Sequence, residues 1–511
     1  MRHNVGGPGS NQYLKRCAAR LTLLPVMHTP LTSQVQTGLQ PDLVHLSDSD
    51  RRVLHTIGQA GGTPRLVGGS VRDALMGQHQ PKDIDIEVYG DIQVDTLVTA
   101  LSHVGLVNEV GRSYGVLKVR SGHTDYDVSL PRRDSKIAAG HRGFSVVADA
   151  GLSERDAAAR RDFTINSIMW DPQSGAIIDP WGGAADLRAG VLRHTSSAFS
   201  EDPLRVLRGV QFAARFGFVL ADDTAAVCRQ LAGSYRELAT ERVWGEWEKL
   251  LTRGTHIKLA LHQLQRSGWD RHYPELTAMY GVRQDTRWHP EGDVFEHTGL
   301  AADQAAQIAQ TAGLADSERL VIVAAALLHD TGKPTTTKII PQPDGTRHIT
   351  AHGHADAGVE PTKQFLQRIG APREIIERTV PLVREHMAAV TTPTPTPAAV
   401  RRLARRLLPS TIQQWALLVH ADRQGRAPGG LPSGTVDSWT QIAQSLHVQE
   451  HPAPNLLRGD HLIAAGLKPG RSFSVILRVA QQAQDGNIFT DEAGAERWLQ
   501  NYLADPTEID V

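Results

Sequence analysis

The segment KDIDIEVYG, residues 82–90, restricts the possible folds of this chain more than any other short stretch. Side chains of a strand point alternately to its two faces, so the segment has one apolar face and one acidic face. The apolar face fits a buried core. Three like charges on the other face repel one another unless a cation lies beside them. We therefore expect a functional strand face that carries Asp83, Asp85 and Glu87.

Composition excludes several classes of protein. The chain has 511 residues, for which about three or four compact units are expected. The net charge of −1 excludes a general attraction to polyanions, so any such site must be a local patch. Only two cysteines are present, which is typical of a reducing compartment, and we expect a cytoplasmic protein. No run of eighteen apolar residues occurs, so neither a spanning helix nor a membrane partner is expected.

The periodicity of the chain changes near residue 196. Short strand patterns alternate with helical ones from about residue 46 to residue 195, and helical periodicity dominates from there to the end. The pattern predicts an α+β fold in which a mixed sheet precedes an all-helical region.

The residues near the acidic strand are of types that bind a phosphate group together with a metal ion. Carboxylates at positions i and i+2 of a strand can hold a hard cation such as Mg²⁺ together with substrate phosphates. The segment GGSVRD, residues 68–73, offers glycines for close backbone approach, a hydroxyl and an arginine fork. Alone, the acidic pair would more often be a solvated strand face. A glycine turn, a short helix and an acidic strand within 22 residues are together a more specific sign of a phosphate-binding site.

The combined stretch LVGGSVRDALMG…PKDIDIEVYG resembles the head domain of class II tRNA nucleotidyltransferases and bacterial poly(A) polymerases, within the DNA polymerase beta-like superfamily. The resemblance implies that Asp83 and Asp85 hold catalytic Mg²⁺. It also implies that the glycine turn binds the incoming nucleotide through Gly68, Gly69, Ser70, Arg72 and Asp73. Asp127 is the expected third carboxylate and Asp125 the alternative, whereas Glu87 matches no ligand of the family.

Two further motifs continue the resemblance. RRDFTINSIMWDP, residues 160–172, resembles the motif that places triphosphate and sugar, which implies roles for Arg160, Arg161, Asp162 and Asn166. EDPLRVLRGVQFAARFGF, residues 201–218, resembles the neck motif that reads the base, which implies roles for Asp202 and Arg205. The alternative is that Asp202 caps the neck helix and Arg205 pairs with it. Arg208 and Arg215 extend the same face as a phosphate track or as a solvated face.

Basic residues gather locally despite the neutral whole. Residues 111–161 are net basic, and the segment RRLARRLL, residues 401–408, predicts a dense basic helix. Phosphate contacts of this kind are blind to sequence, so selection of one folded RNA would depend on its shape.

A second constellation, EHTGLAAD, AALLHDTGK and AHGHADAG, resembles HD-type phosphohydrolase domains. Imidazole and carboxylate together suit a transition metal. The resemblance implies a metal site of His297, His329, Asp330 and a further histidine, either His354 or His352. Asp422 is the candidate distal aspartate, and Lys333 could assist a phosphate. The alternative is a retained fold with little hydrolysis.

The sequence thus predicts an enzyme that adds CCA to the 3′ end of tRNA from CTP and ATP, with Mg²⁺ as cofactor. Alternatives are a poly(A) polymerase, an enzyme adding only CC or only A, and an HD phosphohydrolase with an RNA-binding head. The resemblance implies that two segments bear on specificity. Residues 110–119 contain Tyr114-Gly115 where the tRNA enzymes of the family often have a Phe-Pro pair. The loop of residues 136–158 resembles the loop that the family needs for the switch from C to A, which favours full CCA addition. The oligomeric state stays open. The expected division is a poorly ordered extension (1–45), a nucleotidyltransferase head (46–195), a neck and body (196–280), an HD-type domain (281–392) and a helical tail (393–511).

Overall fold

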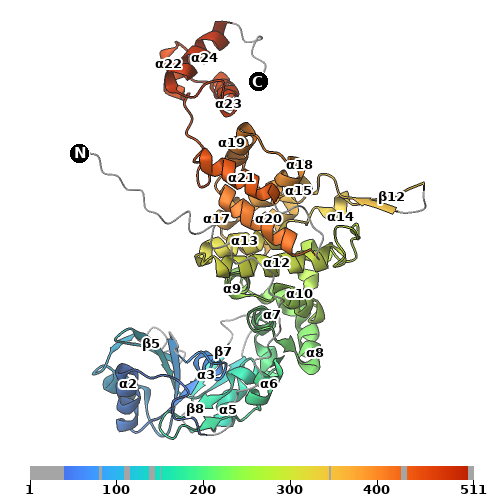
Figure 1. Ribbon diagram of the computed structural model, residues 1–511. Coiled ribbons are helices and arrows are strands. Elements are labelled where there is room, and N and C mark those ends of the chain that lie inside the picture. Colours follow the sequence, from blue (N-terminus) through green and yellow to red (C-terminus); the bar gives the residue numbers. More distant parts are fainter. Residues whose placement is uncertain are drawn as a thin grey trace. The chain divides into compact units, whose positions relative to one another are not determined.

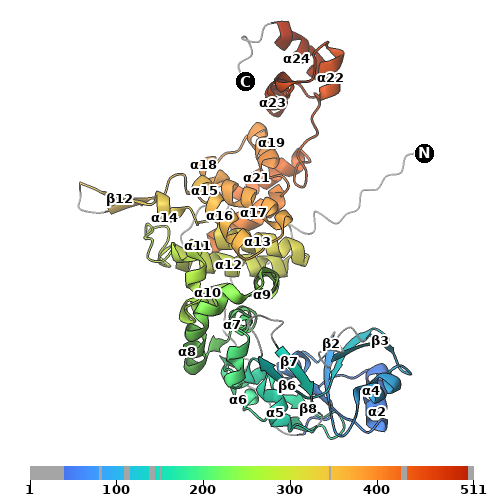
Figure 2. The same cartoon turned by 180° about the vertical axis from the view of Figure 1, so that it is seen from behind.

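The computed structural model describes residues 39–79, 83–108, 116–136, 144–149, 151–343, 347–426 and 434–504. The chain forms two compact units, one ending at His272 and the other beginning at Tyr273 (Figure 1, Figure 2). Within the described ranges, every helix is too short or too polar to cross a lipid bilayer.

The first unit contains a seven-stranded sheet in the order β3-β4-β5-β2-β1-β8-β9. Its β2 and β5 run parallel and the other neighbours antiparallel, so the sheet is mixed, as predicted. The strands are β1 Thr63–Val67, β2 Asp83–Tyr89, β3 Leu106–Asn108, β4 Val116–Ser121, β5 Thr124–Ser129, β8 Met169–Trp170 and β9 Ile177–Ile178. A separate ribbon pairs β6 Arg132–Lys136 with β7 Phe144–Ala148.

The alternating pattern of β2 is confirmed on its apolar face. Ile84, Ile86 and Val88 are at most 2% exposed, while Asp83 and Asp85 are exposed. Glu87 differs from the other two acids because it is completely buried. The sheet is covered by α2 Asp48–Gln59 and α4 Val94–Leu101, and the glycine turn leads into α3 Gly69–Leu75.

The head begins before residue 46 in the structure. Leu43 and Val44, within the predicted extension, are buried, whereas residues 1–38 lie outside the described residues. The head also contains α5 Glu154–Ala159, before β8, and α6 Gly183–Ala189, after β9.

The neck is built around α7 Leu204–Phe216. Its apolar side chains are buried against α9 Thr240–Arg253 and α10 Ile257–Arg266, which leaves its arginines on the other side. Gly217 ends the helix in the left-handed conformation, with a φ of 73°. α8 Asp222–Gln230 completes this region.

The described part of the second unit is helical apart from one hairpin, β12 Lys338–Pro341 with β13 Arg347–Thr350. Its central helices are α12 Val294–Thr311, α13 Asp316–Leu328, α16 Val359–Arg368, α17 Arg373–Glu385 and α20 Ile412–Gln424. Shorter helices are α11 Pro274–Thr277, α14 Lys333–Thr336, α15 His354–Ala357 and α18 Ala388–Thr391. The C-terminal part contains α19 Pro397–Arg406, α21 Gly434–Ser445, α22 Gly459–Ala464, α23 Arg471–Asp485 and α24 Glu492–Ala504.

The predicted basic helix is α19, and much of its charge is used internally. Arg405 binds Asp485 of α23 at 3.0 Å, and Arg406 binds Glu385 of α17 at 2.8 Å. Arg401 donates to the carbonyl oxygen of Asp485. These three arginines therefore hold helices of the same unit together, a use of the basic pattern that the sequence did not predict.

Candidate functional site

The carboxylates of the head come from two adjacent strands. In the parallel β2–β5 pair, Asp85 lies opposite Asp127 and Asp83 lies opposite Asp125, all on one face. Although the side chain of Asp85 reaches the surface, loss of surrounding water raises its pKa, as do the neighbouring carboxylates of Asp127 and Asp83, against the effect of Arg161. Lys118 binds Asp127 at 2.9 Å. Oxygen donors that come together from two neighbouring strands fit a divalent cation.

The glycine turn approaches this acidic face closely. Gly68 has a φ of 72°, and a Cβ built on it would lie 3.1 Å from Oδ2 of Asp85. Any other residue would strain the backbone and crowd the carboxylate. The Ser70 hydroxyl, predicted to contact phosphate, donates instead to the carbonyl oxygen of Val67 at 3.1 Å and is buried.

Arg72 is not an open phosphate fork in this structure. It is 4% exposed, donates to Oδ1 of Asn166 at 2.6 Å and binds Asp73 at 2.7 Å. Its guanidinium lies over the ring of Phe216 at 4.7 Å. Arg215 of α7 binds the same Asp73 at 3.1 Å. The glycine-turn motif and the neck helix are therefore joined through these side chains.

Asp162 is the buried centre of the second motif. One of its oxygens accepts hydrogen bonds from Asn166 and from the backbone N–H of Phe163, each at 2.8 Å. The other accepts from Nε of Arg208 at 2.8 Å. Burial raises the pKa of Asp162, but Arg208 and these hydrogen bonds outweigh it and lower the pKa to about 2. Asp162 is thus ionised, and it fixes Arg208 on the neck.

The base-reading pair of the neck is arranged differently from the sequence expectation. Asp202 accepts from the N–H of Leu204 at 3.2 Å, so it caps α7, and it also binds Arg242 of α9 at 2.8 Å. Arg205 donates to the carbonyl oxygens of Ala198 at 2.8 Å and Arg160 at 2.6 Å. The alternative that Asp202 caps the helix is confirmed, whereas the expected pairing of Arg205 with Asp202 is replaced by these carbonyl contacts.

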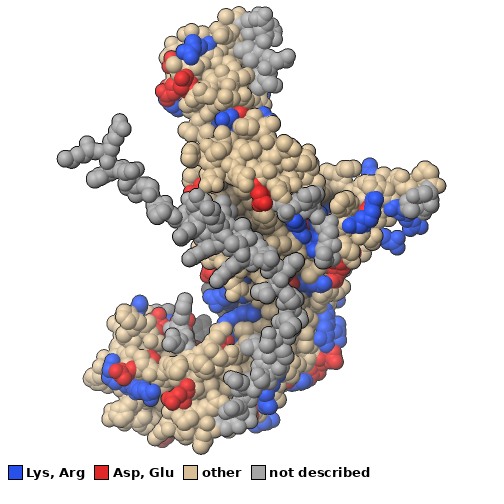
Figure 3. Space-filling view, in the orientation of Figure 1, with Lys and Arg blue, Asp and Glu red and all other residues tan. Residues whose placement is uncertain are grey.

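These motifs line one cavity of about 500 Å³. Its walls contain eight arginines and one lysine against three aspartates, so the cavity is strongly basic and suits a polyphosphate. The predicted residues that line it are Gly68, Gly69, Arg72, Asp85, Arg160, Arg161, Asp162, Asn166, Asp202, Arg205 and Arg208. Ser70, Asp73, Asp83 and Asp127 do not line it. On the face drawn in Figure 3, basic side chains gather over the neck near α9.

Sequence reasoning missed the contribution of α9. Arg242, Lys249 and Arg253 line the cavity from this helix, far from any recognised motif. Their spacings of seven and four residues place them on one helical face, which was the only available signal.

The second unit collects the predicted HD residues in one buried cluster. His297 of α12 lies 3.0 Å from Asp422 of α20, and His329 lies 3.2 Å from Asp330. His354 lies 3.4 Å from Asp330 and is buried, whereas His352 is exposed. The structure therefore places His354 in the cluster in preference to His352.

His386, which follows α17, completes the cluster and was missed. Its Nε2 faces Nε2 of His354 at 3.0 Å. The Nδ1 atoms of both rings contact carbonyl oxygens, of Val383 at 2.6 Å and of Ala351 at 2.7 Å. A carbonyl only accepts, so each neutral ring carries its proton on Nδ1 and the two Nε2 lone pairs face each other. Burial and the imidazoles of His329 and His354 lower the pKa of His386 to about 3, so the ring is in the neutral form that binds metals.

Unsatisfied atoms at the centre of the cluster fit a metal ion. Nε2 of His329 and Oδ1 of Asp330 are buried, and no hydrogen bond reaches them from the described residues. Among the described residues, potential ligand atoms within 4.8 Å of one another form three sets. Two of them belong to this cluster: His297, His329 and Asp422, and Asp330, His354 and His386. The third consists of His289, Glu291 and His297. Imidazole and carboxylate donors together suit a divalent transition metal.

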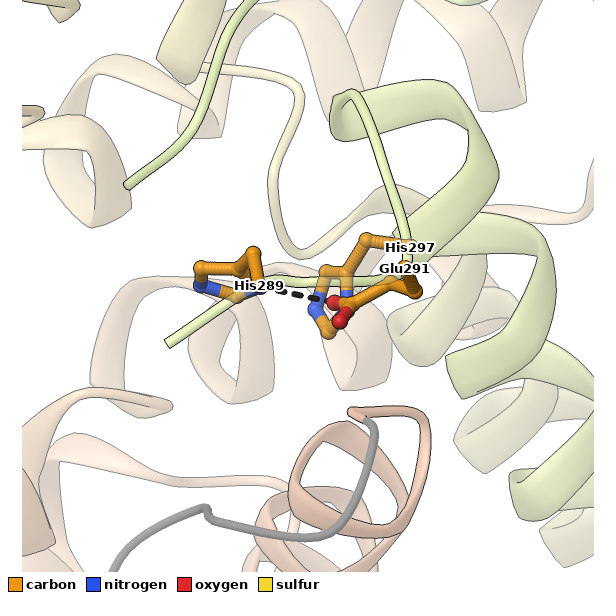
Figure 4. A group of neighbouring side chains, drawn as sticks. All are labelled: His289, Glu291 and His297. Atoms are coloured by element: carbon orange, nitrogen blue, oxygen red, sulfur yellow. Dashed lines mark hydrogen bonds and ion pairs between the residues drawn. The ribbon is translucent and has the colours of Figure 1, made fainter. Parts of the chain in front are cut away.

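Glu291 and His289 form a second group of side chains beside the Nδ1 atom of His297 (Figure 4). Oε1 of Glu291 lies 2.8 Å from Nδ1 of His297 and 2.8 Å from Nδ1 of His289. A carboxylate beside Nδ1 is the arrangement that commonly orients a histidine whose Nε2 binds a metal ion. Lys333 lies 2.6 Å from Asp330, and Arg426 lies 2.7 Å from Asp422. Glu291 lies outside the motifs recognised in the sequence, and Arg426, four residues after Asp422, was not predicted as a site residue.

Family models and relatives agree with these two sites. Residues 64–193 match the poly A polymerase head domain, and residues 294–420 match the HD domain. The multifunctional CCA protein of Xanthomonas campestris pv. campestris (strain B100) is 38% identical over 372 residues, which cover 71% of this chain and 85% of the relative. The multifunctional CCA protein of Xanthomonas oryzae pv. oryzae (strain MAFF 311018) is 37% identical over 371 residues, with the same coverage of 71% and 85%.

Solved structures share the fold. The CCA-adding enzyme of Bacillus stearothermophilus in complex with CTP has a TM-score of 0.59 at 20% identity and covers 90% of this chain and 99% of its own. The Thermotoga maritima CCA-adding enzyme complexed with tRNA has a TM-score of 0.55 at 18% identity, with coverage of 92% and 100%.

A mixed-sheet head with grouped carboxylates and a basic cavity, followed by a helical HD domain, defines a nucleotidyltransferase with an HD domain. Sequence identity and coverage then give the family: the chain belongs to the multifunctional CCA proteins.

Proposed function

We propose that the protein adds C, C and A to the 3′ end of tRNA, using CTP and ATP and releasing pyrophosphate. The observation that carries this proposal is the basic cavity, which joins the glycine turn and Asp85 of the head to Asp202 and Arg205 of the neck. One end of such a cavity suits a triphosphate, and the other presents fixed donors and acceptors to a base. Action on tRNA implies a cytoplasmic protein.

The head carboxylates would hold the divalent cation, for which Mg²⁺ is the proposed identity. Asp83 and Asp85 are its main ligands, with Asp127 opposite Asp85 in the register. When bound, the cation would help to ionise the attacking hydroxyl and neutralise the leaving pyrophosphate. In the reaction, the 3′ oxygen of the RNA forms a bond to the α-phosphorus while the bond from that phosphorus to pyrophosphate breaks. Arg160 and Arg161 are proposed to receive the phosphates.

Selection of the base is assigned to the neck. The helix-capping contact and Arg242 fix Asp202, and two carbonyl oxygens fix Arg205. Polar groups held in this way favour the base whose hydrogen-bonding edge matches them. A wrong base leaves these groups unpaired, at a cost of about 1–3 kcal/mol each.

An extension assay separates this function from its alternatives on the same fold. Purified protein is given tRNA that ends before CCA, with CTP and ATP separately and together, and an unstructured RNA as control. Addition of three nucleotides to tRNA alone supports the proposal. A poly(A) tail, or only CC or only A, would indicate one of the alternatives. The specificity segments are described only in part, because residues 110–115, 137–143 and 150 lie outside the described residues.

We further propose a metal-dependent phosphohydrolase activity in the second unit. The observation that favours it is the pair of ligand sets around Asp330, with buried donor atoms left unsatisfied. These residues would hold divalent transition-metal ions, which when bound can activate water. Hydrolysis of p-nitrophenyl phosphate and bis(p-nitrophenyl) phosphate after loading with Ni²⁺, Mn²⁺ or Co²⁺ tests the activity. Absence of hydrolysis with every metal would leave the HD unit without a catalytic role.

A further inference from the structure

Glu87 is the third carboxylate of the acidic strand, and its environment differs from that of Asp83 and Asp85. It is completely buried, and its neighbours on both sides in the sheet are strands β1 and β5. Its oxygens accept hydrogen bonds from the hydroxyl of Tyr89 at 2.9 Å and from Arg160 at 2.8 Å. Arg161 approaches at 3.4 Å. These contacts leave no room for a metal ion on Glu87, and the carboxylate binds two arginines instead.

Both arginines extend from Glu87 to the nucleotide cavity. Each lines the cavity together with Asp85 and Gly68. Arg161 shows the connection most clearly. Its Nη2 lies on Glu87, while its Nη1 lies 3.5 Å from the position of a Cβ on Gly68, beside the carboxylate of Asp85. One guanidinium thus spans the distance from the buried carboxylate to the glycine turn.

We propose that Glu87 is a positioning residue that holds Arg160 and Arg161 at the triphosphate end of the cavity. This inference rests on the proposed nucleotide addition and names one source of its affinity for nucleotide. Long arginine side chains lose much conformational freedom when they bind a phosphate. A buried carboxylate that fixes them beforehand removes part of that cost.

The proposal predicts a specific kinetic pattern. CTP and ATP share the triphosphate and differ in the base, so loss of Glu87 should raise the KM for both nucleotides by about the same factor. The ratio of C to A incorporation should not change. A role in charge balance alone predicts the opposite sign, because removal of a negative charge would make the cavity more attractive to phosphate.

The test uses Glu87→Gln, which keeps the shape and removes the charge, in the full-length protein. We expect the KM for CTP and the KM for ATP to rise about tenfold or more, while kcat stays within about threefold of the wild-type value. The affinity for pyrophosphate, measured by calorimetry, should fall by the same factor. The control is Glu154→Gln, because Glu154 binds Arg65 at 3.2 Å in the same unit and does not line the cavity. Glu87→Asp, which retains the charge, should recover part of the affinity.

A double-mutant comparison tests whether Glu87 acts through the arginines. In an Arg160→Gln, Arg161→Gln background, Glu87→Gln should change the KM less than twofold. An unchanged or lowered KM in the Glu87→Gln single variant would overturn the proposal, whether or not the melting temperature falls. A tenfold rise in KM caused by Glu87→Gln in the background that lacks both arginines would overturn it as well. Should Glu87→Gln not fold, Glu87→Asp carries the same comparison. If the wild-type protein adds no nucleotide, the proposed function fails, and pyrophosphate affinity still decides the role of Glu87.

Discussion

Asp85 of β2 lies directly opposite Asp127 of β5 in a parallel register, two strands that are 42 positions apart at these residues. The sequence left Asp127 and Asp125 as competitors for the third carboxylate because both share one face of β5. The register separates them: Asp127 is beside Asp85, which itself lies against the glycine turn, while Asp125 is beside Asp83 and is 63% exposed.

The first prediction follows from this register. Asp85→Asn and Asp127→Asn should each lower the rate of nucleotide addition by about 100-fold or more, because each removes an expected metal ligand. Asp125→Asn should lower it by less than about tenfold. Initial rates with saturating CTP measure the difference. Equal losses for Asp125→Asn and Asp127→Asn would contradict the assignment.

The second prediction concerns base selection. Arg205→Ala should lose discrimination among the four nucleotides by about tenfold or more, with tRNA affinity changed by less than about threefold. Arg242→Ala should act in the same direction, because Asp202 then loses its 2.8 Å partner. Incorporation of all four nucleotides is the measurement, with Arg188→Ala, outside the cavity, as control. If binding collapses and selectivity stays, Arg205 is a phosphate contact.

The third prediction is a pH dependence of stability. Asp162 has a pKa of about 2 in the folded protein, below its ordinary value near 4. The unfolded state therefore takes up a proton first as the pH falls, and the stability contributed by Asp162 is present above about pH 4 and lost between pH 4 and pH 2. The contribution is about 2 kcal/mol. Asp162→Asn should show a flatter loss of unfolding free energy over this range in urea titrations. If the unfolding free energy falls with pH equally steeply in Asp162→Asn and in the wild type, Asp162 does not cause this loss of stability.

The fourth prediction concerns metal content. The two ligand sets of the HD cluster, one with His329 and one with His386, predict about two bound transition-metal ions per wild-type chain. His386→Ala should lose about one of them, whereas His352→Ala should lose none because His352 is exposed. Metal analysis after dialysis against Ni²⁺ and then buffer gives the stoichiometry. A single ion in the wild type, unaffected by His386→Ala, would show that the second set does not bind metal.

The fifth prediction is that the two chemistries separate. His329→Ala should abolish metal-dependent phosphohydrolase activity and leave nucleotide addition within about twofold, because the two sites lie in different compact units. Thermal melting checks that the variant is folded. A folded variant that adds nucleotides poorly would mean that the HD region works in tRNA positioning.

Local pattern was sufficient where a short segment fixes its own environment. The alternation in β2, the glycine turn before α3 and the arginine face of α7 could all be read from neighbouring residues. Position in a short motif also identified most of the cavity lining.

Long-range contacts decided the rest. Glu87 could not be distinguished from Asp83 and Asp85 by period alone, because its burial depends on arginines more than seventy positions away. His386 and Arg242 lack a local motif, and only helix packing brings them to their sites. The arginines of α19 gave a basic pattern in the sequence, but their acidic partners lie on other helices.

The most direct test of nucleotide addition compares the wild-type protein with Asp85→Asn on one substrate, a tRNA that ends before CCA. With CTP, ATP and Mg²⁺, the wild-type product should be longer by three nucleotides and end in CCA, with CTP alone giving CC. Asp85→Asn should leave the tRNA unextended while binding it with unchanged affinity. Wild-type protein that does not extend this tRNA, or Asp85→Asn that extends it normally, would contradict the assignment of the head as the site of CCA addition.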